Sequence, residues 1–186
     1  MADAIRYRDG LMIAMLAYIP LRHKNLAAIA IGHSLVREGD NWFVIVAPED
    51  SKTATPIEFQ VPEALVPHLA TYLDRVRPRL LRRRALDALW ISAKGGALSY
   101  SAVGPVLTRH TIKRLGLRIP PHDARDAAAT TWAIAAPDQI GVARDLLAHA
   151  DLRTTTRHYN RARGIEASRA HGRLIAQIRS RRDRGE

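Results

Sequence analysis

The stretch that decides the fold class is residues 42–61, WFVIVAPEDSKTATPIEFQV, in a chain whose other apolar residues mostly recur at helical spacing. Residues 42–47 form a short apolar run, and residues 55–61 alternate apolar with polar side chains, as a half-buried strand does. EDSKTA, at 49–54, is typical of a hairpin loop, and SLVRE at 34–38 can pair with these strands. The sequence therefore predicts a small three-stranded antiparallel sheet.

Helical patterns lie on both sides of this predicted sheet. Tyr7, Leu11, Ala14, Met15 and Tyr18 follow helical spacing up to Pro20. Another helical stripe starts at Glu63 and is followed by a basic stretch, a brief strand-like LWISA and a KGG turn. Further helices are expected at 22–31, 99–116, 121–136, 138–148 and 152–180. The expected class is α+β, mostly helical.

The charge is strongly positive and unevenly distributed. The 186 residues carry a net charge of +11, and residues 109–186 hold 16 Lys or Arg against 8 Asp or Glu. Such a surplus favours a polyanion partner, most often nucleic acid, over an acidic membrane surface. With 47% hydrophobic residues the chain is not a disordered polymer. The absence of cysteine excludes disulfides and thiolate zinc sites, and suits a reducing cytoplasm.

The segment PPHDARDAAATTWAI, at 120–134, places a histidine and an arginine on one helical face. A proline pair opens the expected helix and Asp123 lies in its first turn. His122 and Arg125 are three residues apart and therefore adjacent on the helix surface. The pair could hold an anion at the helix N-terminus, but on its own a solvated arginine beside a capping histidine is the favoured interpretation.

The segment RTTTRHYNR, at 153–161, places Tyr159 between Arg157 and Arg161. Tyrosine near guanidinium groups commonly just packs or stacks. Those cations would also favour the phenolate, and with it nucleophilic character. His149, ten residues earlier at an expected helix end, has the ordinary explanation of a structural histidine.

Two cations nearer the N-terminus complete the candidates. Arg22 follows Pro20 at the junction of the first two expected helices, where a solvated helix-start arginine is the simplest interpretation. Lys52 lies in the expected hairpin loop of a chain with 25 arginines and 4 lysines. A lysine there can give up a proton, which an arginine effectively cannot.

Taken in order, these segments read PLR, SKT, HDAR, LLAH and TTTRHY, and they resemble the motifs of the tyrosine recombinases, the phage-integrase family. The resemblance covers residues 6–180. It departs from the family pattern at several points, among them Asn25, which stands where an acidic residue often follows the first arginine by three positions.

The resemblance implies a catalytic role for six residues: Arg22, Lys52, His122, Arg125, His149 and Tyr159. It implies cleavage of DNA through a 3′-phosphotyrosine bond, with no metal or other cofactor. The implied partners are double-stranded DNA, a homo-oligomer (a tetramer on DNA), and accessory DNA-bending or directionality proteins, with no membrane. The expected location is the cytoplasm, on the nucleoid when DNA is bound.

We expect residues 1–186 to form one catalytic domain, without the family's separate N-terminal DNA-grasping domain. The segment at about 164–186 is expected to be a helix, docked either on its own core or on a neighbouring protomer. Candidate DNA contacts are Arg109, Lys113 and Arg114, although a charged helix face is usually just solvated. The arginines at 82–84 could track phosphates or have no role in a loop. A type IB topoisomerase and a non-catalytic DNA-binding module of the same fold remain alternatives. A basic structural or RNA-binding protein would leave the ordered motifs unexplained.

Overall fold

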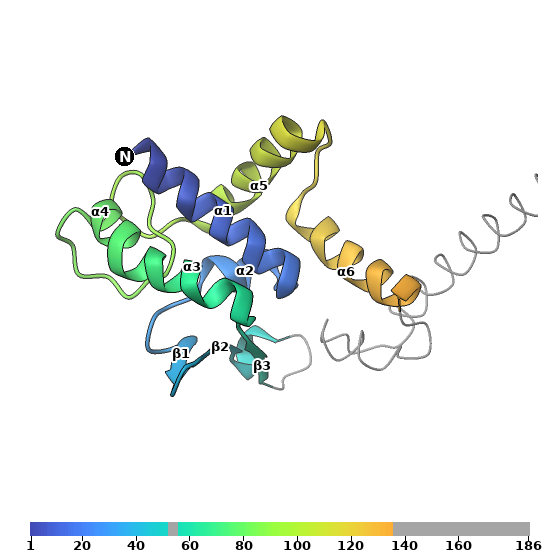
Figure 1. Ribbon diagram of the computed structural model, residues 1–186, viewed down its shortest axis with the longest axis horizontal. Coiled ribbons are helices and arrows are strands. Elements are labelled where there is room, and N and C mark those ends of the chain that lie inside the picture. Colours follow the sequence, from blue (N-terminus) through green and yellow to red (C-terminus); the bar gives the residue numbers. More distant parts are fainter. Residues whose placement is uncertain (52–55, 136–186) are drawn as a thin grey trace, which may run out of the picture. The chain divides into compact units, whose positions relative to one another are not determined.

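The computed structural model describes residues 1–51 and 56–135 (Figure 1). The chain divides into two units, Met1–Arg125 and Asp126–Glu186. The helices are α1 (Ala2–Tyr18), α2 (His23–Ala27), α3 (Val66–Thr71), α4 (Arg77–Leu81), α5 (Tyr100–Leu115) and α6 (Pro121–Ala135). The strands are β1 (Leu35–Glu38), β2 (Asn41–Val46) and β3 (Ile57–Gln60).

The three strands form one antiparallel sheet in the order β1-β2-β3, which confirms the prediction from residues 34–61. Leu35 pairs with Val44, and Val44 in turn pairs with Phe59. Leu35 and Val44 are buried, whereas Glu58 and Gln60 are exposed. The alternation of apolar and polar residues in the sequence therefore indicates which face of the sheet packs on the core. The hairpin loop starts with a 3₁₀ turn, Pro48–Asp50. Residues 52–55 lie outside the described residues.

The helices differ from the predicted pattern in detail. α2 ends at Ala27, because the chain then turns and residues 29–31 make backbone pairs with residues 87–89. The stripe that starts at Glu63 becomes a 3₁₀ turn, α3, a π-helical turn at Tyr72–Val76 and α4. α4 contains the first five residues of the basic stretch RPRLLRRRALD, at 77–87. The expected helices at 138–148 and 152–180 lie outside the described residues.

The buried sides of α1 and α6 could not be read fully from the sequence. Tyr18 is 55% exposed, because α1 ends there and the buried side of the helix continues through Ile19. On α6, Ala129 and Ala133 are buried while Ala127 and Thr131 are exposed. Small residues occur all round this helix, so their pattern could not show which side is covered.

The core of the first unit centres on the LWISA segment. Leu89, Trp90 and Ile91 are at most 1% exposed, and the Trp90 indole donates to the Leu26 carbonyl at 2.8 Å. The Tyr72 hydroxyl donates to the Leu89 carbonyl at 2.9 Å. Burial raises the pKa of Tyr72 to about 12. The segment joins neighbours through isolated backbone bridges rather than a strand. In the described part of the chain, no helix is long and apolar enough to cross a membrane.

Candidate active site

Arg22 occupies the N-cap position of α2, just after the short connection from α1. Its backbone is extended, and its side chain is partly buried. Pro20 and Leu21, which immediately precede Arg22, are buried, so the connection is fixed to the core. Burial lowers the pKa of the Arg22 guanidinium. The arginine is thus held at a defined place rather than on a solvated helix end.

Arg125 reaches the same connection from α6. Its guanidinium donates to the carbonyl of Pro20, two residues before Arg22. His122, one turn earlier on α6, is exposed and lies 3.0 Å (Nε2 to Oδ1) from Asp123. Arg125 of the H-x-x-R segment therefore contacts the chain next to Arg22, although the two segments are 105 residues apart in the sequence.

Arg22, His122 and Arg125 line one cavity of about 280 Å³. Its full lining is Arg22, His23, Lys24, Tyr100, Pro121, His122 and Arg125. None of the lining residues is acidic. All of them belong to the first unit, where the starts of α2, α5 and α6 supply them.

The electrostatics of this cavity suit an anion. Burial, followed by the positive charge of His122, lowers the pKa of His23. Lys24 forms an ion pair with Asp50 (Nζ to Oδ1, 2.9 Å), and the hydrogen bond to that carboxylate raises the pKa of Lys24. Guanidinium groups bind carboxylate and phosphate oxygens with paired, charge-assisted hydrogen bonds. The cavity can therefore bind a phosphate group.

The sequence profile of the Phage integrase family matches residues 1–164. The chain belongs to the phage integrase family. Its class, α+β and mostly helical with a small three-stranded antiparallel sheet, is that of the tyrosine recombinases of known structure.

Individual relatives agree with this assignment. The tyrosine recombinase XerD of Staphylococcus aureus is 24% identical over 150 residues, which are 80% of this chain and 48% of the relative. XerD of Staphylococcus saprophyticus is 28% identical over 152 residues, with the same coverage. The chain thus spans about half the length of these curated relatives.

Solved structures show the same fold. XerH site-specific recombinase bound to palindromic difH substrate, in a post-cleavage complex, superposes with a TM-score of 0.71 at 20% identity. The match covers 91% of this chain and 47% of that one. XerA recombinase gives a TM-score of 0.67 at 20% identity, covering 88% and 56% of the two chains.

Of the six candidate catalytic residues in this integrase-family chain, the structure brings together Arg22, His122 and Arg125. Lys52, His149 and Tyr159 lie outside the described residues. Asp50, two positions before Lys52, contacts the start of α2 through Lys24, and the Asn25 amide donates to its backbone carbonyl at 3.4 Å. Asn25 thus takes part in joining α2 to the start of the hairpin loop.

Sequence reasoning missed His23, Lys24 and Tyr100 as cavity residues. The signal for the first two was their adjacency to Arg22 in the basic tripeptide 22–24. Tyr100 carried no such signal, because it begins α5 nearly eighty residues later and meets His23 only in the folded chain. Their rings stack with centroids 4.1 Å apart and planes 19° apart.

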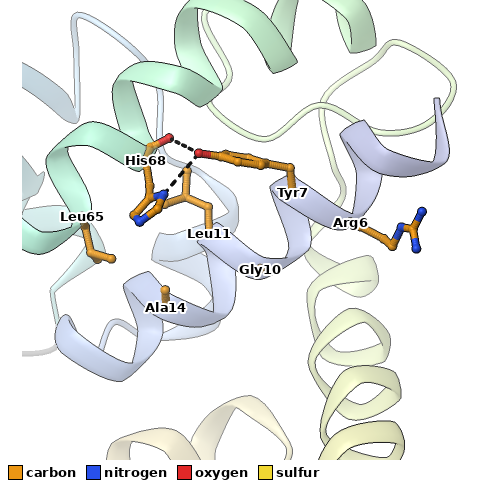
Figure 2. Close-up of a pocket in the computed structure, with 7 residues that line it drawn as sticks. All are labelled: Arg6, Tyr7, Gly10, Leu11, Ala14, Leu65 and His68. Atoms are coloured by element: carbon orange, nitrogen blue, oxygen red, sulfur yellow. Dashed lines mark hydrogen bonds between the residues drawn. The ribbon is translucent and has the colours of Figure 1, made fainter.

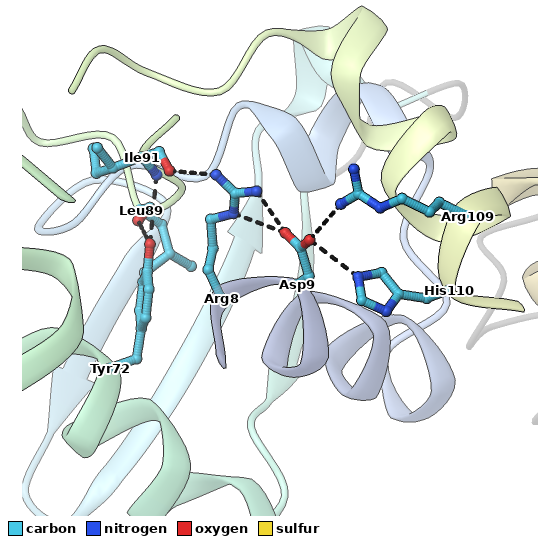
Figure 3. Close-up of polar contacts among 7 residues, drawn as sticks. All are labelled: Arg8, Asp9, Tyr72, Leu89, Ile91, Arg109 and His110. Atoms are coloured by element: carbon cyan, nitrogen blue, oxygen red, sulfur yellow. Dashed lines mark hydrogen bonds and ion pairs between the residues drawn. The ribbon is translucent and has the colours of Figure 1, made fainter. Parts of the chain in front are cut away.

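The candidate DNA contacts on α5 differ from one another. Lys113 and Arg114 are exposed in the last turn. Arg109 donates to the buried Asp9 carboxylate at 2.8 Å, although 61% of its side chain remains exposed (Figure 3). His110 contacts the same oxygen at 3.1 Å. Arg109 therefore has a structural partner within the protein, which sequence reasoning could not see.

A second cavity, of about 270 Å³, lies between α1 and the start of α3 (Figure 2). Most of its lining is apolar, with Leu11, Ala14 and Leu65 along the walls. The Tyr7 hydroxyl donates to the backbone carbonyl of His68 at 3.2 Å, and it lies 3.4 Å from Nδ1 of the His68 imidazole. This second cavity is not lined by Arg22 or Arg125, so the cavity around Arg22 remains the candidate active site.

Proposed function

We propose that the chain is the catalytic part of a site-specific DNA recombinase that cleaves and rejoins strands through a 3′-phosphotyrosine intermediate. The observation that carries the proposal is the meeting of Arg22, His122 and Arg125 around one cavity. These are three of the positions that match the family's motifs, and they come from distant segments. Membership in the tyrosine recombinases and the likeness to a DNA-bound recombinase support the same function.

In this mechanism the Tyr159 oxygen attacks the scissile phosphorus while the bond from phosphorus to the 5′-oxygen breaks. His122 accepts the phenol proton, or holds the groups in line, and Lys52 gives a proton to the leaving 5′-oxygen. Arg22 and Arg125 bind the non-bridging oxygens, and His149 donates a hydrogen bond to one of them. Attack by a 5′-hydroxyl on the phosphotyrosine then reverses these steps and rejoins a strand.

The partners follow from this reaction. Double-stranded DNA is the substrate, with Lys113 and Arg114 as proposed phosphate or groove contacts and Arg109 as a weaker one. Exchange between two duplexes requires two cleavages on each, so we propose a tetramer on DNA. Residues 164–186 are proposed to dock in the same chain or on a neighbouring protomer, and accessory DNA-bending or directionality proteins are proposed to assist.

The test uses the full chain and a pool of nicked duplexes with a randomised segment. A nick next to the cleaved bond lets the short 5′-hydroxyl fragment diffuse away, so the covalent protein–DNA adduct accumulates and survives SDS electrophoresis. We expect recovered strands to share a sequence. We expect adducts to disappear in Tyr159→Phe and to persist in Tyr100→Phe, which removes the hydroxyl of the tyrosine at the described cavity.

The outcomes separate the alternatives. Adducts without sequence enrichment, together with relaxation of an ordinary supercoiled plasmid, would identify topoisomerase activity. Binding of DNA with no adduct in any variant would identify a non-catalytic module. An adduct that survives Tyr159→Phe but not Tyr100→Phe would assign the nucleophile to Tyr100 and overturn the proposed roles.

A further inference from the structure

Tyr100 lines the cavity that contains Arg22 and Arg125, but the proposed reaction gives it no role. It is the first residue of α5 and 51% exposed, and one face of its ring is stacked on His23. His23 directly follows Arg22 in the chain. The stack therefore lies beside the guanidinium that is proposed to bind the phosphate.

A structural role would place this ring differently. Tyr72 shows what such a role looks like, since it is 0% exposed and its hydroxyl donates to the Leu89 carbonyl. Tyr100 keeps half of its surface open while His23 fixes the angle of the ring. A large apolar ring held open to solvent next to an anion site is suited to a ligand that carries both a phosphate and a flat apolar group.

We propose that Tyr100, supported by His23, is a substrate-contacting residue that stacks against the nucleoside adjoining the phosphate bound by Arg22 and Arg125. The inference deepens the proposed function, on which it rests, by naming the part of the substrate that the cavity reads. Stacking on an aromatic ring tolerates any base, because every base has a π-face. The contact would therefore position the strand without adding sequence preference.

Two small probes separate the stacking contact from phosphate binding. Inorganic phosphate can occupy only the arginine site, whereas thymidine 3′-phosphate also offers a base and a sugar. Binding of each to the full chain is followed by NMR titration. The variants are Tyr100→Ala, Tyr100→Phe, Arg22→Ala and, as a matched control, Tyr18→Ala, which removes a ring of similar exposure (55%) that does not line the cavity.

We expect the unsubstituted chain to bind thymidine 3′-phosphate about 10-fold more tightly than phosphate, in keeping with the strength of base–aromatic stacking. Tyr100→Ala should lose this preference while binding phosphate normally. Tyr100→Phe and Tyr18→Ala should keep the preference for the nucleotide, and Arg22→Ala should weaken the binding of both ligands. General damage to the fold would lower both affinities together, so the ratio reports the contact itself.

The inference is overturned if the unsubstituted chain shows no preference for the nucleotide, or if Tyr100→Ala retains that preference. Failure of the proposed function looks different. In that case no adduct forms with the randomised duplexes, while the nucleotide preference still depends on Tyr100. If adducts form but the preference for thymidine 3′-phosphate is unchanged in Tyr100→Ala, the recombinase proposal stands and the stacking contact is ruled out.

Discussion

The dipeptide Arg-His occurs at 22–23, 109–110 and 157–158, and the two copies that lie within the described residues, 22–23 and 109–110, have different surroundings. Around Arg109 and His110, both side chains contact Asp9, whose carboxylate is 1% exposed (Figure 3). Around Arg22 and His23, the cavity lining contains further cations and no carboxylate. The same two residues thus contact a buried carboxylate in one place and, in the other, line the cavity that we propose binds a phosphate.

The difference follows from what each helix packs against. Asp9 also accepts from Arg8 Nε at 2.9 Å, and the Arg8 guanidinium donates to the Ile91 carbonyl at 2.7 Å (Figure 3). This network joins α1 to α5 and to the central buried segment. Buried charges persist only when they are paired and hydrogen-bonded. In the cavity of Arg22, Lys24 and His122 each contact a carboxylate that lies outside the lining, Asp50 and Asp123. The lining itself holds cations from separate segments, and an anion bound among them would reduce their mutual repulsion.

Removing the carboxylate should give the largest effect. Asp9→Ala leaves the buried Arg8 without its ion pair, and we expect a loss of about 3–5 kcal/mol in the free energy of unfolding. Urea denaturation followed by circular dichroism measures it. Asp87→Ala, which removes an exposed carboxylate 3.6 Å from His33, serves as the control and should change little. Equal losses in the two variants would contradict a structural role specific to Asp9.

Removing the cavity arginine should instead affect chemistry. We expect Arg22→Ala to slow adduct formation by about 10²- to 10³-fold, because in the proposed mechanism the guanidinium stabilises negative charge on the non-bridging oxygens. Its unfolding midpoint should stay near that of the unsubstituted chain.

Arg109→Ala is the matched arginine control and should show the opposite pattern, with lower stability and nearly normal adduct formation. If Arg109→Ala slowed the reaction as much as Arg22→Ala, the two Arg-His pairs would not have the distinct roles assigned here.

Much of the fold could be predicted from the sequence, because the sheet and the long helices depend on local periodicity. The strands at 34–61 follow from alternation, and α5 and α6 from helical spacing. The early end of α2 could not be predicted, since it depends on backbone pairing of residues 29–31 with 87–89. LWISA reads as a strand because it is apolar, but its neighbours pair with it only at single bridges.

The candidate site could be predicted only as far as its motifs reach. Arg22, His122 and Arg125 were found by their order along the chain, and the structure places them together. Tyr100 could not be found, because its partner His23 is distant in sequence. Arg109 was predicted to contact DNA because charge alone does not show that a buried carboxylate lies beside it.

The pH dependence of stability provides the finest test of the comparison. Burial and the charge of His122 lower the pKa of His23 below its ordinary value of 6.5. Between the lowered pKa and 6.5 the unfolded chain binds more protons than the folded chain, so stability falls as pH decreases through that window. Above pH 6.5 this contribution is constant.

His23→Phe keeps a ring against Tyr100 but cannot titrate. We expect the stability difference between His23→Phe and the unsubstituted chain to be constant above pH 6.5 and to shift in favour of His23→Phe as pH falls below it. Urea denaturation at a series of pH values measures this difference, which should be the smallest of the three effects. Inorganic phosphate in the cavity should reduce the shift, because an anion beside His23 favours the protonated ring. A pH-independent difference would show that neither burial nor the charge of His122 disfavours the protonated His23 ring, and the contrast between the two Arg-His pairs would lose its electrostatic basis.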